Sequence, residues 1–122
     1  MRKPVIFGMS ILMVLCSLAT AADRFVPDAY PTIQAAIDAA ASGDSVVIRP
    51  GTYSGTGNRD ISFKGKAITV RSLLGPNTCI IDCGGVGRGF LFETNEKNTS
   101  ILQGLTIRNG TAVFGGAIEC YM

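Results

Sequence analysis

Short apolar segments recur along this chain at a regular spacing. Three triplets carry the period and follow one another at equal intervals: VVI at 46–48, ITV at 68–70 and FLF at 90–92. A less regular apolar series lies between and beyond them, and Gly, Pro, Asn and Asp separate the segments. A fixed period in the low twenties, built from strand-like units, is typical of a solenoid. We therefore expect each triplet to pair in parallel with the next triplet along the chain.

A different periodicity marks the stretch before the first triplet. Apolar side chains recur there at helical spacing, at Ile33, Ala36, Ile37, Ala40 and Ala41. Thr32, preceded by Pro31, is a favourable helix start, and Gly43 a favourable end. The predicted helix, over 32–41, is too short to be stable alone. We expect it to cover the open edge of the first coil, where unpaired strand groups would recruit other chains.

The remaining sequence divides into short strands and corners. Residues 23–30 are expected as an irregular lead-in, and 54–60 as a polar loop that bulges from the first coil. Strands are expected at 45–49, 61–63, 67–71, 79–82, 90–93, 101–107 (broken by Gly104) and 117–120. The pattern predicts an all-β solenoid with an N-terminal capping α-helix. The last strand begins one more coil, so we expect truncation at the C-terminus and self-association through the open coil.

The segment 1–21 has the pattern of a secretory signal peptide. Arg2 and Lys3 precede an apolar run over 5–18 that is too short to span a bilayer comfortably. Ala19-Thr20-Ala21 is an A-x-A site followed by polar residues. We expect cleavage after Ala21, which leaves 22–122 as one exported domain, secreted or at the cell surface. An uncleaved N-terminal anchor is the alternative.

Charge narrows the possible partners. Cleavage would remove Arg2 and Lys3 from the 11 basic residues, and the nine that remain equal the nine acidic residues. A net charge near zero does not point to nucleic acid or to an anionic membrane surface, either of which would require a basic stripe. The sequence after 22 also has no apolar segment long enough to cross a membrane. Neither nucleic acid nor, after cleavage, a membrane is expected as a partner.

Three cysteines follow the predicted cleavage site: Cys79, Cys83 and Cys120. In an extended strand Cys79 and Cys83 would lie about 13 Å apart, beyond disulfide reach. If a bridge forms, Cys83 with Cys120 is the more plausible pair. The interpretation that we favour is three small, buried, apolar residues. The chain has no histidine and no recognisable zinc spacing, so no metal site is predicted.

The motifs around these elements resemble a known superfamily. YPTIQAAIDAA at 30–40, GD at 43–44, VVI at 46–48 and PGTY at 50–53 are similar to the N-terminal cap and first coil of the pectin lyase-like superfamily. IIDCGG at 80–85, GRGF at 87–90, GLTIRNG at 104–110 and GGAI at 115–118 look like segments of large exported bacterial proteins with right-handed β-helix repeats. The resemblance covers 23–122 and implies a right-handed parallel β-helix, but no particular chemistry.

The resemblance places the enzymatic motifs of the superfamily outside this sequence. Pectinesterases usually have an acidic residue two positions after the Tyr of their G-x-Y motif, where this chain has Gly55. Their catalytic aspartates, the calcium-binding carboxylates and Arg base of pectate lyases, and the aspartate cluster of polygalacturonases lie in later coils. We therefore predict no catalytic residue and no cofactor in this sequence. Calcium would belong to a full-length lyase.

Asp82 and Arg88 are the best local candidates for contact with a ligand. They lie on either side of a glycine-rich corner. A carboxylate and a guanidinium so placed could bind a uronate or a metal-bridged sugar acid. The interpretation that we favour is that Asp82 caps backbone N–H groups of a turn, with Arg88 exposed nearby.

Other carboxylates are weaker candidates. Glu93, Glu96 and Glu119 could supply a calcium ligand. Glu93 and Glu119 each occupy a strand position, so we expect them on a solvated outer face.

Arginine and tyrosine side chains could also contact a polysaccharide. Arg49, Arg71 and Arg108 each follow a core strand, and if stacked they would form a basic column facing acidic polysaccharide. We favour the alternative that they only cover the solvent side. Tyr53 and Tyr121 could stack on sugar rings, although packing at loop edges is the favoured interpretation.

The resemblance implies two alternative functions. The first is an exported β-helix module, a polysaccharide-associated surface or binding scaffold that is a fragment of a longer protein. The alternative is the N-terminal part of a pectate-lyase-like polysaccharide lyase whose active site lies in later coils. Lyase chemistry needs a base and a calcium cluster on one face, so the sequence as given is predicted to be inactive.

Overall fold

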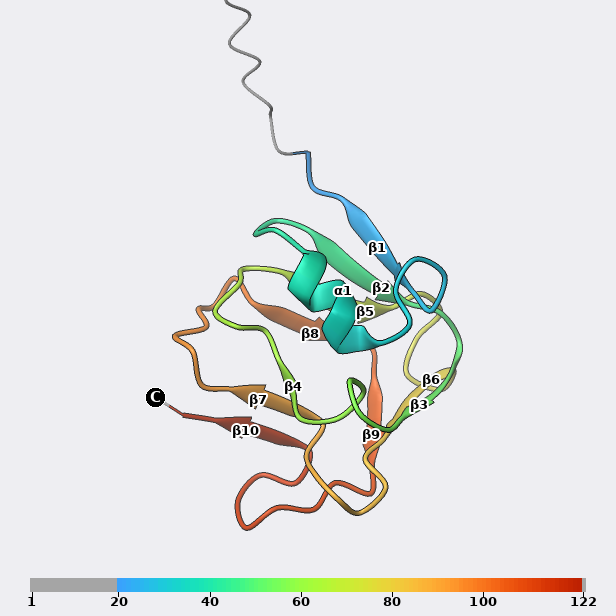
Figure 1. Cartoon of the computed structure of the whole chain (residues 1–122), viewed down its shortest axis with the longest axis vertical. Helices are drawn as coiled ribbons and strands as arrows, with labels where there is room; N and C mark the ends of the chain where they lie inside the picture. Colours follow the sequence, from blue (N-terminus) through green and yellow to red (C-terminus); the bar gives the residue numbers. More distant parts are fainter. Residues whose placement is uncertain (1–19, 122) are drawn as a thin grey trace, which may run out of the picture.

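The computed structural model describes residues 20–121, which fold into three parallel β-sheets and one short helix (Figure 1). The first sheet, sheet A, has the order β1 (Asp23–Val26), β2 (Ser45–Ile48), β5 (Thr69–Ser72), β8 (Ile101–Gln103). Sheet B has the order β3 (Gly51–Ser54), β6 (Cys79–Asp82), β9 (Thr106–Arg108). Sheet C has the order β4 (Ile61–Ser62), β7 (Phe90–Phe92), β10 (Ile118–Cys120). The prediction of a strand-rich parallel fold with one helix is confirmed.

From β2 to β10 the chain visits the sheets in a fixed rotation, A then B then C, three times. Each strand therefore pairs with the strand three places later in the sequence, and every such pair is parallel. The peptide groups of these very short strands thereby find partners in distant segments.

The register that the apolar period predicted is wrong. Val46 lies opposite Val70 rather than Ile68. Val70 in turn pairs with Leu102 of β8, and not with the third apolar triplet. That triplet is β7 of sheet C, which pairs with β4 and β10. Corners and loops differ in length from one turn of the chain to the next. Equally spaced apolar residues therefore do not occupy equivalent positions in successive turns.

Two strands were not expected, and one expected strand is two. β1 falls within the predicted lead-in, and β3 falls in a segment where no strand was predicted, because DRFV and GTYS lack an apolar triplet. The segment 101–107 divides into β8 and β9 on different sheets. Gly104 makes the corner with a φ of +69°, and a Cβ there would lie 2.7 Å from Oγ of Ser72. Both the left-handed backbone and the close approach require glycine.

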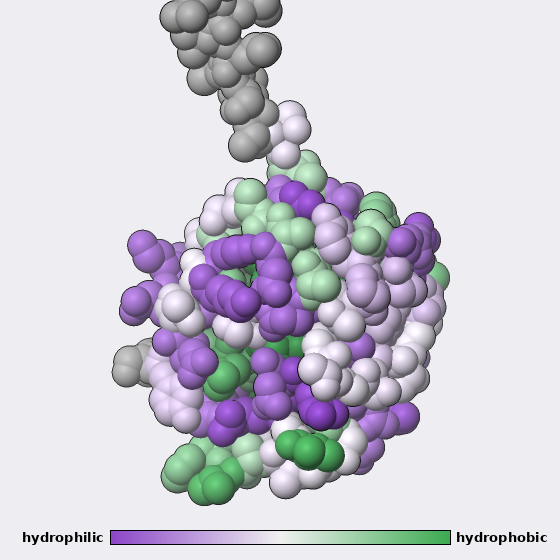
Figure 2. All heavy atoms as spheres, in the orientation of Figure 1, coloured by the Kyte–Doolittle hydropathy of each residue, from purple (hydrophilic) through white to green (hydrophobic). Residues whose placement is uncertain are grey.

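The core fills the space between the three sheets. Val46 and Val70 are paired on sheet A, and both are fully buried. Phe63 contacts the rings of Phe90 and Phe92, with centroid separations of 6.2 and 4.8 Å. The apolar triplets thus supply core side chains. Figure 2 shows a mostly hydrophilic or neutral surface on the face viewed in Figure 1, with hydrophobic side chains gathered at the end that carries the loops before β7 and β10.

The predicted helix is confirmed as α1 (Ile33–Ala39), which packs against β1, β2 and β4. The Thr32 hydroxyl accepts a hydrogen bond from the Ala35 N–H at 3.2 Å, which is an N-cap. Ile33, Ala36 and Ile37 are buried. The helix ends before Ala40, earlier than predicted, and Gly43 turns the chain toward β2 with a φ of +96°.

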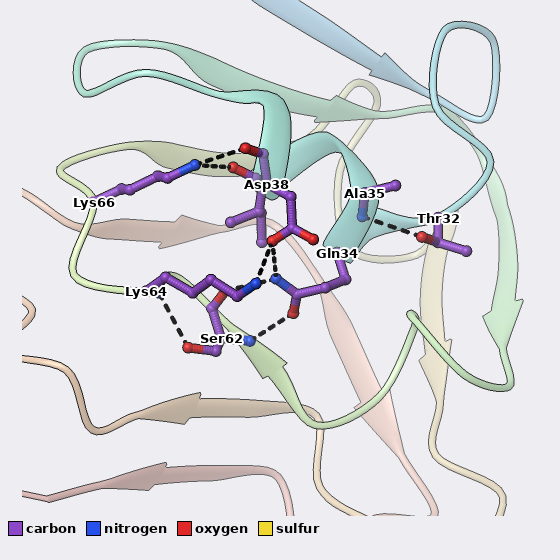
Figure 3. A network of polar contacts seen from close by, with 8 residues as sticks. Thr32, Gln34, Ala35, Asp38, Ser62, Lys64 and Lys66 are labelled. Carbon is purple, nitrogen blue, oxygen red and sulfur yellow. Dashed lines mark hydrogen bonds and ion pairs between the residues drawn. The ribbon is translucent and has the colours of Figure 1, made fainter.

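Polar groups from later segments complete the ends of α1. The ammonium of Lys66 donates to the carbonyl oxygens of Ile37 and Asp38 at 2.7 and 2.9 Å (Figure 3). At the other end the Asn58 side chain accepts from the Ile33 N–H at 3.0 Å. Asn58 is 7% exposed, so this part of the loop 54–60 packs against the start of α1 and does not bulge outward as predicted.

The predicted signal peptide lies almost wholly outside the described residues, which include only Thr20 and Ala21 of it. Within the described part of the chain, no helix has both the length and the apolar character required to cross a membrane.

Candidate functional site

The predicted pair of Asp82 and Arg88 is not formed. Asp82, at the end of β6, accepts hydrogen bonds from the Gly84 N–H at 2.9 Å, the Asn109 amide at 3.0 Å and the Arg108 guanidinium at 3.0 Å. Asn109 first, then Gly84 and Arg108, lower the pKa of Asp82. The favoured interpretation of Asp82 as a turn-capping carboxylate is confirmed, and β9 supplies its cation.

Arg88 forms an ion pair with Glu119 of β10 instead. The Glu119 side chain is 6% exposed and that of Arg88 is 26% exposed. The expectation of a solvated Glu119 and an exposed Arg88 is therefore wrong. The pair holds the outermost strand of sheet C to the corner before β7, so both residues have a structural partner.

The remaining acidic candidates do not gather with Glu119. Glu96 accepts from the Gly65 and Thr94 N–H groups at 3.1 and 2.8 Å. Burial opposes ionisation, but these backbone donors prevail and lower the pKa of Glu96. Glu93 is exposed, as expected. Among residues 20–121, no three His, Cys, Asp or Glu side chains are grouped so that they could hold a metal ion.

The three arginines proposed as a column belong to different surroundings. Arg108 is in β9 of sheet B and pairs with Asp82. Arg49 follows β2 and pairs with Asp28, and its Cζ lies 5.0 Å from the centroid of the Phe25 ring. Arg71 is in β5 of sheet A, opposite Val47 and Gln103. The column is therefore not formed.

Unlike Arg49 and Arg108, Arg71 has no carboxylate partner within the described part of the chain. Its side chain is half-buried, and Nη1 makes only a long contact of 3.5 Å with the Ser72 carbonyl oxygen. The guanidinium borders a pocket of about 310 Å³ at the corner between sheets A and B. The pocket is lined by Arg71, Ser72, Gly75, Pro76, Gln103 and Gly104. We call it the Arg71 pocket.

The polar groups of the Arg71 pocket suit an anion with neighbouring hydroxyls. A guanidinium offers a planar fork of donors that matches a carboxylate. The Gln103 amide can both donate and accept. The Ser72 Oγ accepts from the Gly75 N–H at 3.0 Å, and its own proton remains available to a ligand. Arg71 was singled out from the sequence, but the pocket was not, because Gln103 reaches it through a pairing of β5 with β8 that the apolar period did not predict.

The tyrosines occupy opposite environments. Tyr53 is 9% exposed within β3, where its hydroxyl donates to the Arg49 carbonyl oxygen at 2.7 Å. Tyr53 is therefore packed, as favoured from the sequence, but within a strand and not at a loop edge. Tyr121 is 58% exposed and borders a second hollow of about 260 Å³, lined also by Phe92, Glu96, Lys97, Ser100 and Cys120.

The described cysteines are free thiols. Cys79 and Cys83 are buried, as favoured from the sequence, whereas Cys120 is exposed. Burial raises the pKa of Cys79 to about 11. Cys83 and Cys120 are not bridged in this structure.

Comparison of the chain with protein-family models, with curated proteins and with solved structures gave no match.

Proposed function

We propose that this chain is an exported module of a right-handed parallel β-helix that binds acidic polysaccharide through the Arg71 pocket and does not itself cleave it. Two observations support the fold part of the proposal: the chain passes three times through sheets A, B and C in the same order, and all of the strand pairs are parallel. A short helix over β1, β2 and β4 fits the N-terminal cap of such a fold. The motifs that resemble the pectin lyase-like superfamily are consistent with both features.

The observation that carries the ligand assignment is the unpaired guanidinium of Arg71 beside a pocket. Four other described arginines (24, 49, 88 and 108) each have a carboxylate partner, which already satisfies their charge. Arg71 is half-buried and can give a bidentate contact to the carboxylate of a uronate. Gln103 and Ser72 lie where they can bond sugar hydroxyls. A pocket of about 310 Å³ can hold one sugar residue, while the rest of a longer polysaccharide chain stays outside the pocket.

Binding to polygalacturonate tests the proposal. The full chain, recovered after export, should bind polygalacturonate and oligogalacturonides, with affinity that falls as salt rises. Arg71→Gln should weaken binding about tenfold, because one charged hydrogen-bonding group is lost. Arg59→Gln is the matched control, since Arg59 also lacks an ion-pair partner among residues 20–121 but does not line the pocket.

Three outcomes separate the possibilities. Retained binding by the Arg59 variant with loss in the Arg71 variant supports the assignment. Equal effects of both variants would show that binding depends on general charge and would overturn the Arg71 pocket. Release of unsaturated uronide from polygalacturonate with calcium, above that of a vector control, would replace the non-catalytic proposal with the lyase alternative.

A further inference from the structure

The carboxylate of Asp44 joins three segments at the N-terminal end of the fold. Its Oδ1 accepts a hydrogen bond from the backbone N–H of Ala22 at 3.0 Å. Its Oδ2 accepts from Nε of Arg24 and the N–H of Ala41, both at 2.9 Å. Asp44 is only 5% exposed. The side chain thus ties the start of β1 to the end of α1 and the start of β2.

Ala22 is held by both of its backbone groups. While its N–H donates to Asp44, its carbonyl oxygen accepts from the Ser45 N–H at 2.9 Å. This second bond extends the parallel pairing of Asp23 with Ser45 by one residue. Ala22 is also the residue that follows the A-x-A site at 19–21. Among residues 20–121, the first whose backbone is hydrogen-bonded to the fold is therefore the residue that the predicted cleavage would make the N-terminus.

We propose that proteolytic cleavage between Ala21 and Ala22 completes the N-terminal cap by placing a free ammonium on Asp44. An exported-protein peptidase adds water across this peptide bond, which leaves a carboxylate on Ala21 and an amine on Ala22. The amine takes up a proton at neutral pH because its ordinary pKa is about 8. The Ala22 nitrogen already lies 3.0 Å from Oδ1 of Asp44, so a neutral donor becomes a charged one without movement.

The site favours the charged donor. The Ala22 N–H already donates to an ionised acceptor, and an ammonium in its place adds the attraction between opposite charges to that charge-assisted hydrogen bond. Ala22 is exposed, so the two further protons of the ammonium remain in water and little solvation is lost. The charged groups at this end are Arg24, which donates to Asp44 and to the Tyr30 hydroxyl at 2.7 Å, and the exposed carboxylate of Asp23. Asp44 faces two cations, so the ammonium shares its partner with Arg24.

The inference rests on the export part of the proposed function, and its test begins with the exported chain. Its N-terminus, read by intact mass, should be Ala22. The pKa of the Ala22 α-amine, measured by NMR on this unmodified chain, should lie above about 8. A chain that begins at Thr20, in which Ala22 keeps an amide nitrogen, should melt about 4 °C lower at pH 6. Above the raised amine pKa this difference should disappear, because the ammonium has lost its charge.

Asp44→Asn should abolish the difference between the two N-termini, and the amine pKa remains an independent test if that variant fails to fold. An exported chain that begins at another residue would overturn both the cleavage position and the inference. A mature chain that begins at Ala22, with an ordinary amine pKa and no loss of stability on extension, would overturn the inference alone and leave export intact. Binding through the Arg71 pocket is measured separately and is unaffected by either result.

Discussion

The side-chain amide of Gln34 forms two hydrogen bonds with the backbone of Ser62. It accepts from the Ser62 N–H at 2.9 Å and donates to the Ser62 carbonyl oxygen at 3.0 Å (Figure 3). Ser62 is in β4, the outer strand of sheet C at this end. One amide thus replaces the peptide group of a neighbouring strand. The helix therefore caps the fold by polar pairing as well as by apolar cover, and it satisfies an edge that would otherwise recruit another chain.

Gln34→Met should lower the free energy of unfolding by about 2 kcal/mol, because two backbone groups of Ser62 lose their partner while the side-chain volume is nearly kept. Denaturant unfolding of the wild type and the variant measures the difference. Gln103→Met is the matched control, since Gln103 is exposed on β8, and it should change stability by less than about 0.5 kcal/mol. Equal stability of the Gln34 variant and the wild type would contradict the capping role.

The ion pair of Arg88 and Glu119 should matter more than that of Arg49 and Asp28. The side chains of the first pair are 26% and 6% exposed, and those of the second are 43% and 49% exposed. Glu119→Gln leaves a poorly solvated guanidinium and should cost about 3 kcal/mol. Asp28→Asn should cost less than about 1 kcal/mol, because water screens an exposed pair. Chemical denaturation of both variants makes the comparison.

Two further measurements separate an ion-pair effect from a packing defect. Arg88→Met combined with Glu119→Leu should be more stable than either single variant, since no unpaired charge is left behind. Hydrogen exchange should show the loss first at β10, the strand that carries Glu119. A Glu119→Gln variant as stable as Asp28→Asn would mean that the pair does not hold β10.

The sequence predicted most of the strands and the helix because their signals are local. The stripe of Ile33, Ala36 and Ile37 follows the helical period, and the Val46 and Val70 segments are apolar enough to be core strands. Register was not predictable in this way. It depends on the lengths of corners and loops and on which side chains face inward, and these vary from turn to turn.

The candidate site was harder to predict because partners lie far apart in the chain. Asp82 was correctly interpreted as a turn cap, since that role needs only the nearby Gly84. Its cation, Arg108, and the partner of Arg88, Glu119, come from strands one turn further along. Pairing errors of this kind follow directly from the wrong register.

Stability should fall in acid through Asp44. The N–H groups of Ala22 and Ala41, then the Arg24 guanidinium, lower the pKa of Asp44 from 3.8 to about 2. A carboxyl whose folded pKa is depressed stabilises the fold fully above its ordinary pKa, and that stabilisation is lost as pH falls through the folded pKa. The decline attributable to Asp44 should therefore fall between about pH 4 and about pH 2.

Unfolding measured from pH 6 to pH 2 tests this assignment. Asp44→Asn should be less stable at pH 6 and should show a shallower decline in acid, because it has no carboxyl to protonate. Asp23→Asn removes the same charge from an exposed residue on β1 and should keep the decline of the wild type. An Asp44→Asn variant whose acid profile parallels that of the wild type would show that other carboxyls control the decline.

The three described cysteines should differ in reactivity according to burial. Thiolate, not thiol, is the reactive form. Cys79 is fully buried and has a pKa raised to about 11, so it should not react in the native chain at pH 8. Burial also raises the pKa of Cys83, whereas Cys120 is exposed. In 22–122, a thiol reagent should label one residue natively and three after denaturation, and peptide mass mapping should identify Cys120 as the first. Cys120→Ser should remove the native labelling and leave two thiols, whereas a Cys83–Cys120 disulfide would contradict the structure.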